Sequence, residues 1–172
     1  MNKLGLLMML GLFAATIGGC ATSRQVSTTT IATAAPPAKV KPFLMFQGAA
    51  AGEPVAEEAM RFYMSLFDDA RAIDVQKYAA GEAGPEGSIK MATFEIAGVQ
   101  VMCSDSPIDH AFDFTPSSSL LVTCADEAEL DRLFVALGEQ GETLMPPGDY
   151  GFSRKFAFVA DRYGVSWQLM LP

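Results

Sequence analysis

The sequence is poor in the side chains that most often carry metal and nucleotide chemistry. Among its 172 residues it has one histidine, His110, together with three cysteines and one tryptophan. Acidic residues number 20 against 12 Lys and Arg, which gives a formal net charge of -8. An acidic chain without a basic patch argues against nucleic acid as a partner. The sequence also lacks a G-x-S-x-G element, a Walker motif and a dinucleotide-binding fingerprint, so the common hydrolase and nucleotide-binding classes have no support.

The first twenty residues have the organisation of a secretion signal. Lys3 supplies a positive charge, and the apolar run from Leu4 to Ile17 is too short for a comfortable membrane-spanning helix. Gly18-Gly19-Cys20 follows, and small residues directly before a cysteine resemble the bacterial lipobox. We expect residues 1–19 to be a lipoprotein signal peptide, with lipid attached to Cys20. An ordinary signal peptide or a membrane anchor with an incidental cysteine is the alternative.

Residues 20–39 contain the expected lipidated cysteine and a stretch rich in Thr, Ala, Ser and Pro. Such a segment has too few large apolar side chains to order itself, and we expect it to be a flexible tether. The predicted location is the bacterial cell envelope, with the protein anchored to the membrane through lipid and facing the periplasm or the exterior. Residues 40–172 are left to form one domain.

Hydrophobic periodicity in residues 40–172 predicts the same order of elements twice: a strand, a helix and three strands. In the first half, Pro42 suits the beginning of a strand, and Glu53-Pro54 suits the beginning of a helix. In the second half, Asp126 and Glu129 have the spacing of a helix capping box. The predicted strands are 41–46, 70–78, 88–96, 99–103, 119–124, 142–144, 155–160 and 165–171. The predicted fold class is α+β, with two paired βαβββ modules forming a cupped mixed sheet.

The end of the chain carries a resemblance to a known family. Asp161-Arg-Tyr-Gly-Val-Ser-Trp-Gln168 resembles the last hairpin of the PhnB-like branch of the vicinal oxygen chelate superfamily, and Met145 to Ser153 fits the same branch. This superfamily includes the glyoxalase and bleomycin-resistance proteins, and the branch is also called demethylubiquinone methyltransferase-like. The resemblance implies a pocket in a cupped sheet and a possible homodimer. Because no Gly-rich turn of the cofactor-binding kind follows a strand, we do not expect methyl transfer.

The resemblance also implies where a metal would bind. Enzymes of this superfamily hold a divalent metal with His and Glu from the first, fourth, fifth and eighth strands. Those places fall here at Phe43, at Cys103 beside Met102, at Ser119 and at Gln168. Phenyl, thiol, hydroxyl and amide groups do not make a set for Mg²⁺, Mn²⁺ or Zn²⁺. His110 falls in the linker between the modules, where a surface loop residue is expected. We therefore expect neither a metal nor another cofactor.

The same positions suggest a polar and aromatic binding pocket. Gln168 and Ser119 can donate and accept hydrogen bonds, and Phe43, Phe158 and Trp167 can stack on a planar ligand. The predicted ligand-binding residues are Phe43, Cys103, Ser119, Trp167 and Gln168. A place in the hydrophobic core is an equally good interpretation of Trp167. Cys103 and Cys124 can pair as a disulfide outside the cytoplasm, or they can be small buried apolar residues.

Two functions remain open on the sequence. The first is a lipid-anchored, metal-independent module that binds a small, partly apolar molecule. The second is an enzyme of the superfamily with an atypical site, acting as a lyase, isomerase or dioxygenase. The absent His and Glu set favours the binding module.

The lipid anchor is open to a direct test. Because the acyl chains would be carried by Cys20, the Cys20→Ser variant should leave the membrane fraction or remain unprocessed. Labelled fatty acid should be incorporated into the wild-type chain and not into the variant. Absence of label from the wild-type protein would show that the lipoprotein interpretation is wrong.

Overall fold

The computed structural model describes residues 39–48 and 52–172. The signal peptide, Cys20 and nearly all of the tether lie outside these residues. Residues 37–172 form one compact unit of the chain, and the description below concerns that unit. Within residues 39–48 and 52–172, no helix has the length and apolar character needed to cross a membrane.

The first module has the predicted order of one strand, one helix and three strands. Its elements are β1 (Phe43–Phe46), α1 (Ala56–Ser65), β2 (Arg71–Lys77), β3 (Ile89–Ile96) and β4 (Val99–Asp105). The strands lie in the order β1-β4-β3-β2. β1 runs parallel to β4, with Phe43 opposite Met102, and the other pairs are antiparallel. The sheet is therefore mixed, as expected.

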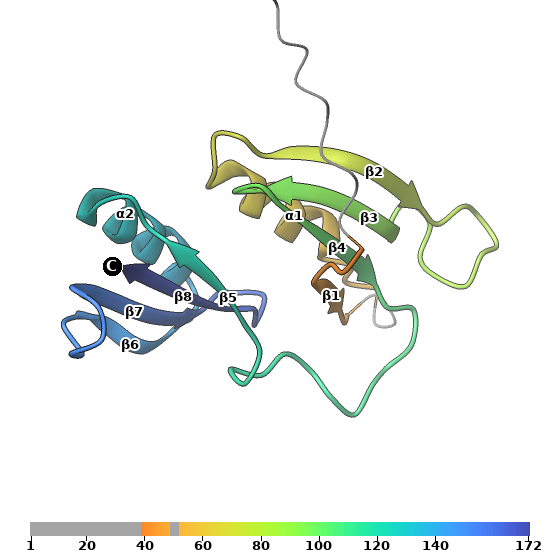
Figure 1. The fold of residues 1–172 in the computed structure, drawn as a ribbon. Helices are drawn as coiled ribbons and strands as arrows, with labels where there is room; N and C mark the ends of the chain where they lie inside the picture. Colours follow the sequence, from red (N-terminus) through yellow and green to blue (C-terminus); the bar gives the residue numbers. More distant parts are fainter. Residues whose placement is uncertain (1–38, 49–51) are drawn as a thin grey trace, which may run out of the picture. The chain divides into compact units, whose positions relative to one another are not determined.

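The second module repeats this arrangement. Its elements are β5 (Ser119–Thr123), α2 (Glu127–Gly138), β6 (Glu142–Gly148), β7 (Lys155–Ala160) and β8 (Ser166–Leu171). The strand order is β5-β8-β7-β6, with β5 parallel to β8. Two βαβββ modules are confirmed (Figure 1).

Several strand ends differ from the sequence expectation by one or two residues, and two elements differ by more. Helix α1 begins at Ala56 and not at Glu53-Pro54. Strand β6 continues through Pro146 and Pro147 to Gly148, although the expected strand stopped at Leu144. Proline is tolerated there because β6 is the edge strand and pairs only with β7, with register shifts around Met145.

Each sheet buries one face against its own helix. Side chains alternate along β4, so Val101 and Cys103 point to the core side with α1. On β8 the same alternation turns Trp167 and Leu169 toward the core and α2. The buried apolar side chains of both modules form one continuous cluster. The opposite face of each sheet is left without a helix (Figure 1).

The helix N-termini are capped in two different ways. Asp126 accepts a hydrogen bond from the Glu129 backbone N–H, as the capping-box spacing predicts, and the Glu129 carboxylate accepts one from the N–H of Ala125, one residue before the N-cap. Helix α1 has no side-chain cap from its own N-cap residue, Val55. The buried carboxylate of Asp105, at the end of β4, instead accepts from the N–H groups of Val55 and Ala56 and, through its other oxygen, from that of Ile89.

A second buried carboxylate, Asp161, joins the two modules. It accepts hydrogen bonds of 2.8 Å from the Tyr63 hydroxyl on α1 and from the Trp167 indole on β8. It also accepts from the backbone N–H groups of Tyr163 and Val165, which shapes the turn between β7 and β8. Burial raises the pKa of Asp161, and the hydrogen bonds oppose that rise. Burial and the Asp161 charge together raise the pKa of Tyr63, so this phenol remains a donor.

We expect Asp161→Ala to lower the free energy of unfolding by about 3–5 kcal/mol. The substitution leaves a buried phenol and a buried indole N–H without their acceptor, and removing one member of a buried charged network typically costs this much. Urea denaturation followed by Trp167 fluorescence measures the change. The exposed Asp109→Ala variant is the control and should stay within about 0.5 kcal/mol of the wild type. Equal stability of Asp161→Ala and wild type would contradict the assigned role.

Candidate functional site

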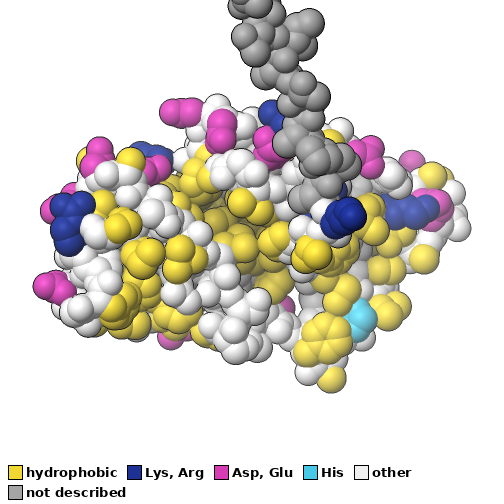
Figure 2. Space-filling view, viewed as in Figure 1, with side chains coloured by type: hydrophobic (Ala, Val, Ile, Leu, Met, Phe, Trp, Pro, Cys, Tyr) yellow, Lys and Arg dark blue, Asp and Glu magenta, His cyan; other side chains and the backbone are white. Residues whose placement is uncertain are grey.

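The face of the two sheets that the helices leave uncovered carries the candidate site. Strand alternation places Phe43 and Met102 on this face in the first module, and Ser119 and Gln168 in the second. Hydrophobic side chains gather across the middle of the face, while charged side chains lie mainly toward its periphery (Figure 2). Phe43 is 47% exposed, which is unusual for a phenylalanine in a strand.

Two of the sequence-predicted site residues lie on the other side of their strands. Cys103 is fully buried against the core, so Met102 and not Cys103 faces the candidate site. Burial raises the pKa of Cys103 to about 12 and that of Cys124 to about 11, so both thiols are protonated at neutral pH. Both cysteines are free, and the disulfide does not form.

Trp167 is a core residue with one polar contact. It is 1% exposed, its indole donates to Asp161, and its ring lies 5.1 Å from that of Tyr63. It does line an apolar hollow of about 200 Å³ together with Ser119 and Leu120. Its main role in the structure is packing, which was the alternative that the sequence left open.

A hollow lies between β1 and β5 and has a volume of about 260 Å³; we call it the first hollow. Phe43 lines it from β1, Ser119 from β5, and Phe114 from the linker between the modules. Gln168 does not line it. Instead, the Gln168 side-chain amide donates a 2.8 Å hydrogen bond to the Ser119 hydroxyl. Gln168 therefore acts on the first hollow through Ser119, and leaves the Ser119 proton available to another acceptor.

Sequence reasoning missed Ser166, which also lines the first hollow. This residue is 2% exposed, and its hydroxyl has no hydrogen-bond partner within the described residues. A buried hydroxyl without a partner is uncommon, since it loses its hydrogen bonds to water. The sequence did contain a signal: Ser166 lies two residues before Gln168 on one strand, and therefore on the same face.

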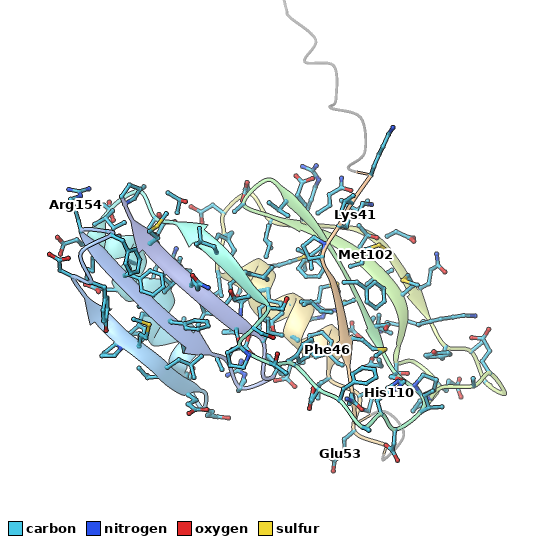
Figure 3. All side chains as sticks on the ribbon, turned by 60° about the horizontal axis from the view of Figure 1, so that its bottom comes forward. Lys41, Phe46, Glu53, Met102, His110 and Arg154 are labelled. Atoms are coloured by element: carbon cyan, nitrogen blue, oxygen red, sulfur yellow. The ribbon has the colours of Figure 1, made fainter. Side chains whose placement is uncertain are left out.

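The linker between the modules is fastened to the end of β1. The Gln47 side chain accepts from the His110 backbone N–H at 3.1 Å and donates to the Phe112 carbonyl. The His110 ring hydrogen-bonds Ser106 through Nε2 at 2.9 Å and stacks on Phe112, with ring centroids 4.8 Å apart. His110 lies in the linker beside the end of β1 that carries Phe46, as the loop assignment predicts (Figure 3).

The side chains at the superfamily's metal positions do not fit a divalent ion. On the uncovered face they are a phenyl ring at Phe43, a thioether at Met102, a hydroxyl at Ser119 and an amide at Gln168. Mg²⁺ and Mn²⁺ favour carboxylate oxygens, and Zn²⁺ favours imidazole and thiolate. In the part of the chain that the structure describes, no three His, Cys, Asp or Glu residues come together in a metal-binding arrangement.

Comparison with protein families decides the assignment. Residues 38–170 match the family described as 3-demethylubiquinone-9 3-methyltransferase. The chain is a PhnB-like member of the vicinal oxygen chelate superfamily. No curated protein matches this PhnB-like chain.

Solved structures agree with the family and its fold. A PhnB protein from Bacillus cereus, described as a putative 3-demethylubiquinone-9 3-methyltransferase, is 47% identical, with a TM-score of 0.72 over 78% of this chain and 100% of that one. Protein PA1353 from Pseudomonas aeruginosa is 24% identical, with a TM-score of 0.65 over 78% and 98% of the two chains. A fosfomycin resistance protein, FosX, from Listeria monocytogenes, solved with Mn(II), is 12% identical, with a TM-score of 0.50 over 77% and 90%. The last two similarities concern the fold alone.

The PhnB protein from Bacillus cereus corresponds to the domain alone. All of its chain corresponds to 78% of the present one, without a segment equivalent to the remainder. The domain from residue 38 onward is therefore suited to experiments in solution.

The Ser166 hydroxyl has no hydrogen-bond partner within the described residues, and this predicts an unusual response to its substitution. Ser166→Ala removes a buried polar group without a partner, so the free energy of unfolding of the PhnB-like domain should stay constant or rise by about 1 kcal/mol. Ser153→Ala is the matched control, because the single proton of the buried Ser153 hydroxyl has two carbonyl acceptors within reach, those of Lys155 and Leu171. That control should lose about 1 kcal/mol. Urea denaturation compares the two, and an equal loss in both would mean that Ser166 has a partner in the protein.

Proposed function

We propose that the protein is a membrane-tethered, metal-independent module that binds a small, partly apolar molecule in the first hollow. The observation that carries the proposal is the buried Ser166 hydroxyl, which has no partner within the described residues and borders the hollow. The Ser166 oxygen is itself covered, so a ligand with a hydrogen-bonding group at that point would restore the missing bond once the Ser166 side chain turns toward the hollow. The sequence features around Cys20 support the tether.

The lining of the first hollow suits binding with few polar contacts. Phe43, Leu44, Phe114 and Leu120 supply apolar surface, and Ser119 and Ser166 supply hydroxyl groups. Pockets of this kind hold a ligand mainly by apolar contact and orient it with a small number of polar groups. The Gln168 amide fixes the Ser119 hydroxyl, so one of these polar groups is already oriented.

An atypical enzyme of the superfamily is the second candidate. It would have to work without the usual metal ligands, and the two thiols of the domain are protonated at neutral pH. The family description names a methyltransferase, and nothing in the first hollow supports methyl transfer. Binding without chemistry therefore agrees better with the side chains present.

Isothermal titration calorimetry of the domain with Mg²⁺, Mn²⁺ and Zn²⁺ tests metal independence. We expect no stoichiometric, submicromolar binding to the wild type, because an amide, a hydroxyl, a thioether and a phenyl ring are poor ligands for these ions. Native mass spectrometry of the same sample, with metal analysis, shows any molecule that copurifies. Tight metal binding that Gln168→Ala abolishes would overturn the proposal and restore the metalloenzyme.

Binding should depend on the Gln168 amide through Ser119. For any ligand found in the first hollow, Gln168→Ala should weaken binding by about 1 kcal/mol, the usual net contribution of one hydrogen bond, because the Ser119 hydroxyl loses the partner that orients it. The fold should remain intact, because Gln168 lies on the face without a helix. Two further variants separate the effects of length and charge: Gln168→Asn has a shorter amide, and Gln168→Glu has a charged carboxylate of the same length. Unchanged affinity in Gln168→Ala would remove Gln168 from the site.

A further inference from the structure

The first hollow has a neighbour that shares part of its lining. A second hollow, of about 290 Å³, is lined by Phe43, Met45, Gln47, Phe112, Asp113 and Phe114. Three of these residues, Phe43, Asp113 and Phe114, also line the first hollow. One molecule can therefore contact both hollows on either side of these shared side chains.

The second hollow combines one carboxylate with three aromatic rings. Phe112 is 60% exposed, and Phe43 is also well exposed, so both rings offer a face to a ligand. Phe114 is held in place by the buried Phe46, with ring centroids 5.3 Å apart. A carboxylate among phenyl faces attracts positive charge, because the ring faces carry negative partial charge.

The Asp113 carboxylate is available to a ligand. Its Oδ1 accepts a 2.8 Å hydrogen bond from the Phe114 backbone N–H, which fixes the side chain. Its Oδ2 has no donor among residues 39–48 and 52–172, and none of the ion pairs formed by these residues includes Asp113. One oxygen thus orients the group while the other is left for a partner.

Basic side chains are absent from the described lining of both hollows. Lys41 precedes β1, at the opposite end of that strand from His110 (Figure 3), and it is not among the residues that line either hollow. His110 stacks on Phe112, but its Nε2 is engaged by Ser106. An anionic ligand would therefore meet Asp113 without a compensating charge in the lining, at an unfavourable Coulomb energy.

We infer that the ligand of the proposed site is an organic cation, with its ammonium group at Asp113 among Phe43, Phe112 and Phe114 and its less polar part in the first hollow. The inference rests on the proposed binding function and adds the charge of the ligand to it. Any polar group on this less polar part then lies in the first hollow, near the hydroxyl groups of Ser119 and Ser166 and away from the ammonium group.

Three small compounds with one phenyl ring each test the charge preference. Benzyltrimethylammonium is the cation, benzyl alcohol the neutral probe and benzoate the anion. Each is titrated into the isotopically labelled domain from residue 38 onward, and affinity is measured from amide chemical shifts. We expect the cation to bind about fivefold more tightly than benzyl alcohol, as is typical of one partly exposed charge contact with aromatic neighbours, and benzoate to bind most weakly. Added salt should weaken binding of the cation and not of the alcohol.

Two matched variants locate the charge. Asp113→Asn keeps the shape of the side chain, so it should remove most of the preference for the cation over benzyl alcohol and leave the affinity for the alcohol unchanged. Asp109→Asn removes an exposed charge from the same linker and should change neither. The amide spectrum shows whether each variant is folded.

The outcomes separate the inference from the proposed function. Binding of benzyl alcohol near Ser119 and Ser166, without preference for the cation or without an effect of Asp113→Asn, would overturn the inference and keep the binding site. Tighter binding of benzoate than of the cation would overturn it as well. Failure of all three probes to shift amides around the two hollows would overturn both the inference and the proposed site.

Discussion

The arrangement of this domain depends on the hydrogen bonds that the buried Asp161 carboxylate accepts. The strands form two separate four-stranded sheets, and no backbone ladder among the described residues joins β1 to β5. The modules are connected by side chains instead, with Tyr63 of the first and Trp167 of the second both donating to Asp161. The Arg132 guanidinium adds a bond to the Leu66 carbonyl. A charge taken out of water is tolerated only when such donors surround it.

This way of joining the modules also explains where the hollows lie. Had β1 and β5 paired through their backbones, side chains would fill the seam between them as they fill the interior of each sheet. Because the contact is made on the helix side, through Tyr63 and Trp167, the opposite side of the seam remains open beside Phe43 and Ser119. The linker, held to Gln47, closes part of that opening and brings Asp113 to it. The site therefore arises from the joint between two repeated units.

The sequence predicted the fold more fully than the site, because the two depend on different features. Repeated periodicity defined both modules, and it tolerates errors of a residue or two at each strand end. Site prediction does not, because a shift of one residue turns a side chain to the other face. On β4, Met102 faces the candidate site, whereas Cys103, the next residue, is buried in the core. On β8, Trp167 is buried in the core, and Gln168, the next residue, lies on the uncovered face. Ser166 and Asp161 were missed because their roles depend on contacts, or the lack of them, between segments far apart in sequence.

The side chains that replaced the metal ligands indicate what this site can do. Acid–base or nucleophilic chemistry needs a group that changes its protonation near neutral pH, and burial keeps the Cys103 and Cys124 thiols protonated there. Hydroxyls, an amide and phenyl rings do not titrate in this range, but they discriminate between ligands. A molecule that hydrogen-bonds the buried Ser166 hydroxyl gains a bond that other molecules lack, and phenyl faces beside Asp113 penalise negative charge. These side chains therefore suit the binding role proposed above, in which the site selects among ligands.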